Sequence, residues 1–438
     1  MSEDLSIALT AERLDEGTPE EKACFGLLRM QSRGSDLISG FDHYTNGYRP
    51  GPLVSGYALG EWLAWNWWRL QWEPRTSSAE WWRAHNLTAI GEGYGWPNLT
   101  VFSDGVRAAL VCKASLRADA KPFRYLGSPA CIVSRTQLQS AIDDYQGQLL
   151  GRLRDGGIAA SNLLTLWSDV LAERADPETA KRRKLEALLG RDPDAFAVDD
   201  LETLVRDEAL LGESAVEELA ADNRPANRLF TADALTGFAQ DFGQDTRPDD
   251  AARLRDKADL VFRADVPAWV IGSRAALRLR VQEKLGDGRI NDAALARMAG
   301  VAEQAIAGAE KSEAGPLSFS LDRSPTAGRV VFRSRWKSSR RFDAARLIGD
   351  RAVVGGPDRL RAATRAGTYR QKMQRAFAAE FLSPFEAVEA FLSGDFSPDA
   401  QEEAARHFDV SERTILTLLV NHGRVEREEL EDELAPAA

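Results

Sequence analysis

RRFDAARLIGD (residues 340–350) and QKMQRAFAAEFLSP (residues 371–384) are the most informative segments of this 438-residue chain. Both place apolar side chains at three- to four-residue spacing, which predicts a helix in each. The helical block that contains them is expected to begin near Arg341 and to break at Gly355-Gly356-Pro357, because glycine and proline interrupt helices. The block ends at Leu382-Ser383-Pro384, since proline cannot continue a helix.

The sequence on either side predicts further helices and a few short strands. Helices are expected over RAALRLRVQEKL (274–285) and DAALARMAG (292–300), and strands around Leu317–Leu321 and Arg329–Arg333. The segment DAQEEAARHFDVSERTILTLLVNHG (399–423) predicts a helix, a tight turn and a second helix.

From Trp269 to Gly423, about a third of the chain, this order of segments resembles the ImmA/IrrE family of zinc metallopeptidases. In that family a helix pair precedes a short sheet, the catalytic helix carries RFxxAHELGH, the next helix carries ExxANxFAAExLxP, and a final module contains FxVS. The corresponding segments here are RRF with the Ala and Gly that follow it, then FAAEFLSP, then FDVS. The resemblance implies a zincin-like C-terminal domain that ends in a helix-turn-helix-like module.

The residues at the family's metal site differ from those that bind zinc. The two ligand positions of the catalytic helix hold Arg346 and Asp350, the general-base position holds Leu347, and the third ligand position holds Gln371. The HExxH pattern works because two histidines four residues apart share one helix face. A guanidinium stays protonated and cannot ligate zinc, and leucine cannot accept a proton from water. We therefore expect a degenerate pseudo-peptidase with no catalytic residue, no metal and no cofactor.

The distribution of charge allows two interpretations of these positions. The net charge is −11, yet Arg323–Arg375 contains 15 Lys and Arg against three acids, a charge of +12. In the first interpretation the former metal-site residues lie on the surface, released from catalytic constraint, and the arginines pair with acidic helices of the same chain. In the second, a basic cleft holds phosphate or carboxylate, and its residues are Arg340, Arg341, Arg346 and Arg375.

The terminal helix-turn-helix-like module is a candidate DNA-binding element. Ser411 is placed as the N-cap of its second helix, and Arg413 and Thr414 would face the bases if that helix entered a major groove. The module also carries several acids, and EREELEDEL (426–434) follows it. Acidic groups near a phosphate backbone reduce affinity. In the family that the chain resembles, this motif commonly packs within the peptidase domain.

Residues 1–154 predict a small α+β domain that is rich in tryptophan. YALGEWLAWNWWRL (57–70) predicts one helix that is buried on most sides, and two apolar runs joined by Asp104-Gly105 predict a hairpin. Eight of the 11 tryptophans fall within 35 residues. We expect these indoles in the core, with a partner-binding face as the alternative. The candidates for that face are Trp67, Trp68 and Trp72.

The expected fold class is α+β and helix-rich, in three parts. These are the Trp-rich domain (1–154), a helical region (155–262) and the pseudo-peptidase domain (263–438). Ser134 and Gln137 form a plausible capping box for a helix that runs to about Arg154. Asp245–Asp250 is polar and contains proline, which is typical of a linker.

Composition excludes several classes of protein. Three widely spaced cysteines and four scattered histidines provide neither a disulfide framework nor a paired metal motif. No apolar run approaches the roughly 20 residues needed to cross a bilayer. Met1–Leu14 has acids where a signal peptide requires a basic start. We therefore expect a cytoplasmic protein with no membrane partner.

These observations together predict a non-catalytic recognition or regulatory protein that binds a protein partner, with nucleic acid left open as a further ligand. The resemblance implies a stress-response or mobile-element (antiviral) defence setting, because active relatives cleave repressors that control such genes. Two alternatives remain. One is a DNA-binding transcription regulator that acts through residues 398–421, and the other is a hydrolase with an unrecognised N-terminal site.

Overall fold

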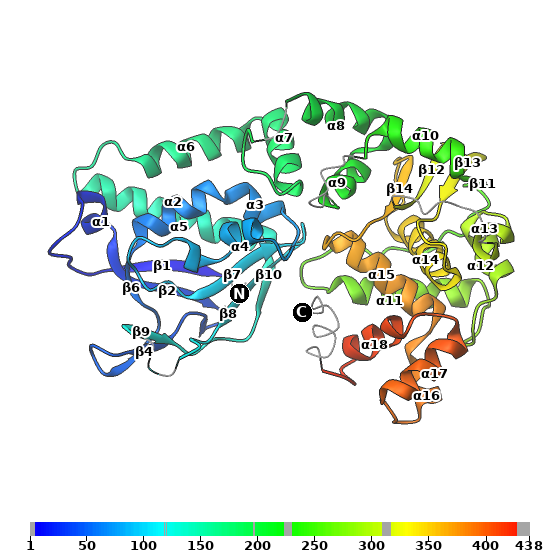
Figure 1. Ribbon diagram of the computed structural model, residues 1–438. Helices are drawn as coiled ribbons and strands as arrows, with labels where there is room; N and C mark the ends of the chain where they lie inside the picture. The colour runs from blue at the N-terminus through cyan, green and yellow to red at the C-terminus, as the bar shows by residue number, and fades with distance from the viewer. Residues whose placement is uncertain are drawn as a thin grey trace. The chain divides into compact units, whose positions relative to one another are not determined.

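The computed structural model describes residues 5–117, 119, 121–195, 198–222, 230–308 and 317–426. Helices account for 49% and strands for 16%, which confirms the helix-rich α+β class. The chain divides into two compact units, an N-terminal unit of Met1–Leu201 and a C-terminal unit of Glu202–Ala438, whose elements are labelled in Figure 1. The acidic tail lies outside the described residues from position 427 onward.

The N-terminal unit combines small antiparallel sheets with helices. Its elements are β1 (Ser6–Ala11), α1 (Pro19–Ala23), β2 (Phe25–Ser32), β3 (Ser35–Asp36), β4 (Gly40–Asp42), β5 (Gly47–Arg49), β6 (Leu53–Ser55), α2 (Gly56–Trp65), α3 (Trp67–Trp72), α4 (Ala79–His85), the 3-10 helix η1 (Leu87–Ala89), β7 (Asn98–Ser103), β8 (Arg107–Lys113), β9 (Phe123–Tyr125), β10 (Cys131–Ser134), α5 (Arg135–Asp155), α6 (Asn162–Ala175) and α7 (Pro177–Leu188). The strand orders are β1-β2-β3 with β6 on β2, β10-β8-β7 and β5-β4-β9.

Two local predictions for this unit are confirmed. The hairpin of β7 and β8 turns at Asp104-Gly105. The Asp104 carboxylate accepts hydrogen bonds from the amides of Val106 and Arg107, and Gly105 has a φ of +91°. Glycine adopts such a backbone without steric cost. Ser134 and Gln137 form the expected capping box at the start of α5.

The helix predicted over residues 57–70 is instead broken into α2 and α3 at Asn66. The Asn66 side chain donates a hydrogen bond of 2.9 Å to the carbonyl of Trp62, and this local bond competes with helix continuation. The break directs Trp67 and Trp68 into the core, at 3% and 6% exposure, while Trp65 is 61% exposed.

The helical region predicted for residues 155–262 does not form a unit of its own. Helix α6 packs on α2, and α7 packs on α3, so both belong to the N-terminal unit. Helices α2 and α3 cover the apolar faces of α6 and α7, because a single helix cannot bury its own apolar stripe. The division into two units near residue 201 therefore replaces the expected division into three.

The C-terminal unit packs helices on one antiparallel sheet. Its elements are α8 (Val198–Leu211, which begins in the N-terminal unit), α9 (Glu213–Ala221), α10 (Ala232–Phe242), β11 (Gln244–Thr246), α11 (Ala268–Gln282), α12 (Asp292–Ala299), α13 (Glu303–Ala307), β12 (Ser318–Ser324), β13 (Ala327–Val331), α14 (Lys337–Val353), β14 (Leu360–Ala363), α15 (Tyr369–Leu382), α16 (Phe385–Leu392), α17 (Pro398–Phe408) and α18 (Glu412–Asn421). The strand order is β11-β13-β12-β14. The linker predicted at Asp245–Asp250 is wrong, because β11 pairs with β13 there.

Helices α11, α14 and α15 lie against one another and form the centre of this unit (Figure 1). Two glycines allow the close approach. A Cβ atom at Gly272 of α11 would lie 2.5 Å from the carbonyl oxygen of Met373 in α15, and one at Gly349 of α14 would lie 2.5 Å from the Phe377 ring. Both distances are far inside van der Waals contact, so α15 packs where only glycine fits.

The last two helices, α17 and α18, follow the expected helix, turn, helix pattern. Asp409 has a left-handed backbone with φ of +56° in the turn, and the Ser411 hydroxyl caps α18 by accepting a hydrogen bond from the Thr414 amide. No helix within the described part of the chain is long and apolar enough to cross a membrane.

Gly272→Ala is expected to lower the free energy of unfolding by about 1–3 kcal/mol, because the added methyl group overpacks the contact of α11 with α15. Gly237→Ala is the matched control, since nothing lies within 4 Å of a Cβ atom there. This control should be neutral or slightly stabilising. Chemical denaturation of both variants measures the difference, and equal stability of the two would contradict the close packing.

Candidate functional site

The residues that the resemblance aligns with the metal site of the ImmA/IrrE family meet between α14 and α15. Arg346 and Asp350 are four residues apart on α14, and Gln371 and Gln374 are three apart on α15, so each pair shares a helix face. Arg346 donates a hydrogen bond of 2.5 Å to Oε1 of Gln371, and Gln374 donates one of 2.8 Å to Oδ1 of Asp350. We call these four residues, with Arg361 and Arg370, the α14–α15 cluster.

Arg346 is fixed at one end of the cluster. Its Nη2 donates to the Gln371 side chain and to the carbonyl of Thr364, and a carboxylate oxygen of Asp343 lies 3.6 Å from Nη1. The side chain is buried, and burial lowers the pKa of the guanidinium. Gln371 also accepts the Thr364 amide and donates to the carbonyl of Ala362, which ties α15 to β14.

Asp350 is the centre of the cluster and is completely buried. Arg370 holds both carboxylate oxygens at 2.7 Å, and Arg361 approaches one of them at 3.4 Å. Burial alone would raise the pKa of this carboxyl, but the charges of Arg370 and Arg361 outweigh burial and hold it at about 2. Asp350 is therefore ionised at neutral pH, with its oxygens already occupied.

The donor set of the cluster does not suit a metal. Arg346 is a cation, Gln371 offers a neutral amide, and Asp350 is bound by two guanidinium groups. Leu347, at the former general-base position, is a buried apolar side chain. Within the described ranges, no three His, Cys, Asp or Glu side chains are grouped to hold a metal ion. The cluster stabilises the contact of α14 with α15 through charge and hydrogen bonds.

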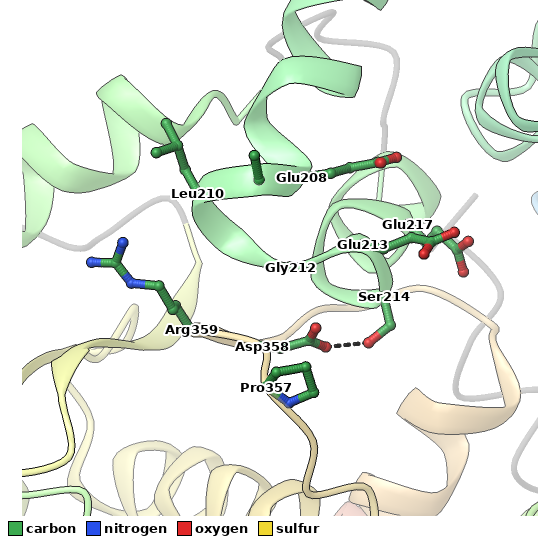
Figure 2. A pocket seen from close by; sticks show the side chains of 10 residues that line it. Glu208, Leu210, Gly212, Glu213, Ser214, Glu217, Pro357, Asp358 and Arg359 are labelled. Atoms are coloured by element: carbon green, nitrogen blue, oxygen red, sulfur yellow. Dashed lines mark hydrogen bonds between the residues drawn. The ribbon is translucent and has the colours of Figure 1, made fainter. Parts of the chain in front are cut away.

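A hydrogen-bond chain continues from the cluster to a pocket. Nη1 of Arg370 donates a bond of 2.7 Å to the hydroxyl of Ser214 in α9, and that hydroxyl donates to Asp358. Figure 2 shows the Ser214 side chain directed at the Asp358 carboxylate, with a dashed line for the hydrogen bond between them. The volume is about 560 Å³, and the lining residues are Glu208, Ala209, Leu210, Gly212, Glu213, Ser214, Glu217, Pro357, Asp358 and Arg359.

This pocket was not predicted from the sequence. Ser214 and Asp358 are 144 residues apart, and neither belongs to a recognisable motif. The lining has four carboxylates and one guanidinium. Because the Ser214 hydroxyl is held between Arg370 and Asp358, its hydrogen atom points to a carboxylate, and Ser214 positions α9 against the loop before β14.

The proposed basic cleft is only partly assembled. Arg340 is buried and donates to the carbonyl groups of Ile306 and Arg335. Arg341 is fully buried, pairs with Asp292 and donates to the carbonyl of Ile290. Arg341 pairs with an acid of the same unit, as the internal-pairing interpretation expects, whereas the acceptors of Arg340 are backbone carbonyls.

Arg375 and Arg413 lie on the Arg346 side of the unit. Nη2 of Arg375 donates a bond of 3.1 Å to the carbonyl of Ala366. Burial first, and then the nearby charge of Arg346, lower the pKa of Arg375 to about 9, and the charge of Arg413 acts in the same direction. Arg413 is exposed at the start of α18, whereas Thr414 is buried and bonds to Ser411. Thr414 therefore does not face outward as a base-reading residue would.

The three candidate tryptophans pack inside the N-terminal unit. Trp68 donates a bond of 2.7 Å to Glu173, and Trp67 lies under the guanidinium of Arg174. The Trp72 ring lies within 4.3 Å of both Arg135 and Lys184. These contacts favour the core interpretation, and the exposed indoles in this part of the chain are Trp65 and Trp82.

Sequence reasoning also missed a buried polar network in the N-terminal unit. Glu73 accepts a hydrogen bond of 2.7 Å from Nε of Arg69, and its Oε2 lies 2.9 Å from Nε2 of His85. Nδ1 of His85 lies 2.7 Å from the carbonyl oxygen of Val101. The network joins α3, α4 and β7. All three side chains are more than nine-tenths buried, so the arrangement is structural.

Comparison with known proteins gives no relative for this arrangement, since no family model, curated protein or solved structure matches the chain. The chemistry of the site is defined by its own residues. Near Arg346 the cluster combines a guanidinium, the Gln371 amide and the Asp343 carboxylate, and the half-buried Arg375 donates to the carbonyl of Ala366.

Asp350→Asn is expected to lower the free energy of unfolding by about 3–5 kcal/mol, because it leaves Arg370 and Arg361 buried without their shared charge partner. Denaturant unfolding at neutral pH measures the loss. Arg359→Gln, on the exposed rim of the pocket, is the control and should change stability little.

The same variant tests the pH dependence. Because the pKa of Asp350 is lowered from 3.8 to about 2 on folding, its stabilisation is complete above about pH 4 and is lost as the pH falls through 2. The wild-type protein should therefore lose stability in this range more steeply than Asp350→Asn. Parallel acid-unfolding curves for the two proteins would contradict the assignment.

Proposed function

We propose that this protein is a non-catalytic recognition protein that is built on a degenerate ImmA/IrrE-like metallopeptidase fold and binds a protein partner. The observation that carries the proposal is the Arg346–Gln371 and Asp350–Arg370 pairing at the former metal-site positions. A peptidase of this type needs an open coordination position and a base. Here the equivalent space is filled by side chains that bind one another.

A protein partner is supported by the surface of the N-terminal unit. The connection between β4 and β5 exposes Tyr44 at 88%, and Tyr48 at 70% on β5 stacks edge-on against Phe41 at 5.3 Å. Exposed tyrosines are enriched at protein interfaces, because they combine a large apolar ring with a polar group. The net charge of −11 disfavours general attraction to nucleic acid. A stress-response or mobile-element defence setting, in a cytoplasmic location, belongs to the same proposal through the family resemblance.

The second candidate is a DNA-binding regulator that acts through residues 398–421, and the exposed Arg413 is the observation in its favour. The contacts of the turn weaken this candidate. The Asp409 carboxylate in the turn accepts from Arg289 at 2.6 Å and lies 3.2 Å from the Lys337 ammonium. Helix α18 packs on α15 and α16, so much of its surface is committed within the unit.

The metal content of the purified protein tests the proposal. Wild-type protein should contain no stoichiometric zinc, whereas Arg346→His combined with Gln371→Glu should gain one site. These changes place an imidazole and a carboxylate beside Asp350, the donor types that zinc prefers. Elemental analysis and zinc titration measure both. Stoichiometric zinc in the wild-type protein would overturn the proposal.

The partner class is tested by fluorescence anisotropy with labelled duplex DNA, single-stranded DNA and RNA across a salt series. The proposal predicts no nucleic-acid binding at physiological salt, and capture of a protein that is lost when Tyr44 and Tyr48 are both changed to Ser. Tight, strongly salt-dependent binding to DNA that Arg413→Gln removes would instead support the regulator.

A further inference from the structure

The small sheet β5-β4-β9 of the N-terminal unit has one face in the core and one face turned outward. Along β9, Phe123 and Tyr125 are 9% and 6% exposed and belong to the core, whereas Arg124 between them is half-buried. Leu126, the next residue on the Arg124 side, is 47% exposed. Strand β4 repeats this alternation at Phe41, which is half-buried between two buried neighbours. The outward face of the sheet is therefore separate from the face that packs on the core.

Large side chains form a row across this outward face. The strand register places Tyr48 of β5 opposite Phe41 of β4, and Phe41 opposite Arg124 of β9. The ring centroids of Tyr48 and Phe41 are 5.3 Å apart, and the Arg124 guanidinium lies 5.9 Å from the Phe41 centroid. The His43 ring stands edge-on to Phe41 at 5.2 Å. We call these four residues the β4 face.

Two exposed lysines lie on segments that are bonded to the strands of the β4 face. Lys121 directly precedes Pro122, whose carbonyl accepts the His43 amide at 3.1 Å. Lys113 ends β8, and the chain that follows it is joined to β9 by a bond of 3.0 Å from the Ser115 amide to a backbone carbonyl. Among the described residues, no carboxylate lies within 4.0 Å of either ammonium group. Both lysines are thus available to an incoming acidic group.

The charge of this part of the surface is opposite to that of the chain as a whole. Residues 40–49 and 113–126 contain five Lys and Arg against two acids, a charge of +3, whereas the chain carries −11. One of the two acids, Asp42, is buried and pairs with Arg49 at 3.1 Å. An acidic ligand is therefore attracted to this region and repelled by the rest of the chain.

We propose that the β4 face binds an acidic segment of a protein partner, in which Asp or Glu residues stand next to apolar ones. Tyr48 and Phe41 offer ring surface to the apolar side chains of such a segment. The planar guanidinium of Arg124 and the ammonium of Lys121 offer donors to its carboxylates. This inference rests on the proposed function, because Tyr48 belongs to the surface assigned there to a protein partner.

The angles between the rings favour a peptide over single-stranded nucleic acid. Successive bases stack on open aromatic faces. Phe41 is half-buried, and its ring plane is inclined at 76° to that of Tyr48 and at 80° to that of His43. Rings that are nearly perpendicular to one another form no continuous platform for stacked bases. Apolar side chains do not need such a platform, because hydrophobic contact is non-directional.

Selection from a phage-displayed library of short random peptides on the full chain tests the proposal. The library is first passed over the variant with both Tyr44→Ser and Tyr48→Ser, so that peptides bound elsewhere on the protein are removed. The peptides that then bind wild type should be enriched in Asp and Glu beside apolar residues. Enrichment of basic or uncharged peptides, or the absence of any peptide that depends on the two tyrosines, would overturn the proposal.

Fluorescence anisotropy with one selected peptide measures the contribution of charge. Arg124→Gln should weaken binding about tenfold, the loss expected for one partner of a charge-assisted contact. Lys121→Glu alters an exposed side chain, so it tests the face even where Arg124→Gln fails to fold. It should also weaken binding and reduce the salt dependence, because an attractive charge becomes a repulsive one.

Two matched variants of the same unit serve as controls. Trp65→Ser removes an exposed aromatic ring from α2, and Arg154→Glu reverses an exposed charge on α5. Both should leave peptide binding unchanged. Equal effects of Lys121→Glu and Arg154→Glu would show that only the total charge matters and would overturn the proposal.

The other occupants of the β4 face give distinct results. A labelled single-stranded oligonucleotide that binds wild type but not Tyr48→Ser would contradict the choice of a protein segment. Concentration-dependent dimerisation that Tyr48→Ser abolishes would assign the face to a second copy of this chain and overturn a separate partner. Capture of a protein through Tyr44 and Tyr48, without acidic peptides in the selection, would reject the acidic segment and leave the proposed function standing.

Discussion

The carboxylate of Asp350 lies at the centre of the C-terminal unit, where Arg370 binds both of its oxygens and Gln374 binds one of them. This interaction has no access to water, so it is strong only while all of its partners are present. Arg370 extends the hydrogen-bond network to Ser214 and, through it, to Asp358. Arg361 extends the network to the carbonyl of Gly355. Through these bonds one buried charge holds α14, α15, α9 and the segment before β14 in fixed positions.

A zinc ion with ligands on two helices would join α14 to α15 by coordination, and here charge pairs and amide hydrogen bonds join them. The two ways of joining the helices differ in whether a binding position is left open. A catalytic zinc site keeps one position open for water or substrate, whereas the oxygens of Asp350 in the α14–α15 cluster are already bound by Arg370, Arg361 and Gln374. At one end of the cluster Arg346 lies 3.6 Å from a carboxylate oxygen of Asp343 and donates to Gln371 and to the carbonyl of Thr364.

Features encoded by local sequence were predictable. The hairpin at Asp104-Gly105, the capping box of Ser134 and Gln137, and helices α14 and α15 depend on neighbours within a few residues. The missed elements depend on distant partners. β14 has the sequence LRAA, with no apolar alternation, and it becomes a strand only by pairing with β12. β11 is polar, which is typical of a linker, yet it forms the edge of the same sheet.

The residues of the candidate site fall into the same two groups, those that the local sequence indicates and those that depend on distant partners. The family pattern indicated Arg346, Asp350 and Gln371, and these residues do come together. It could not indicate Arg370 or Ser214, because their roles arise from a partner far along the chain. Nor could it show that Arg341 pairs with Asp292 while Arg346 binds Gln371, because a sequence does not tell which way a charged side chain points. The one available signal was the number of arginines in segments otherwise apolar enough to be buried.

The central proposal is that a closed network of side chains occupies the space that the metal centre would fill in the ImmA/IrrE family. A crystal structure of the wild-type protein grown with zinc, with anomalous diffraction recorded at the zinc edge, tests it most directly. The account predicts no anomalous peak between α14 and α15, with Arg346 on Gln371 and Arg370 on Asp350. A peak there, with Asp350 turned away from Arg370 to ligate the ion, would contradict it.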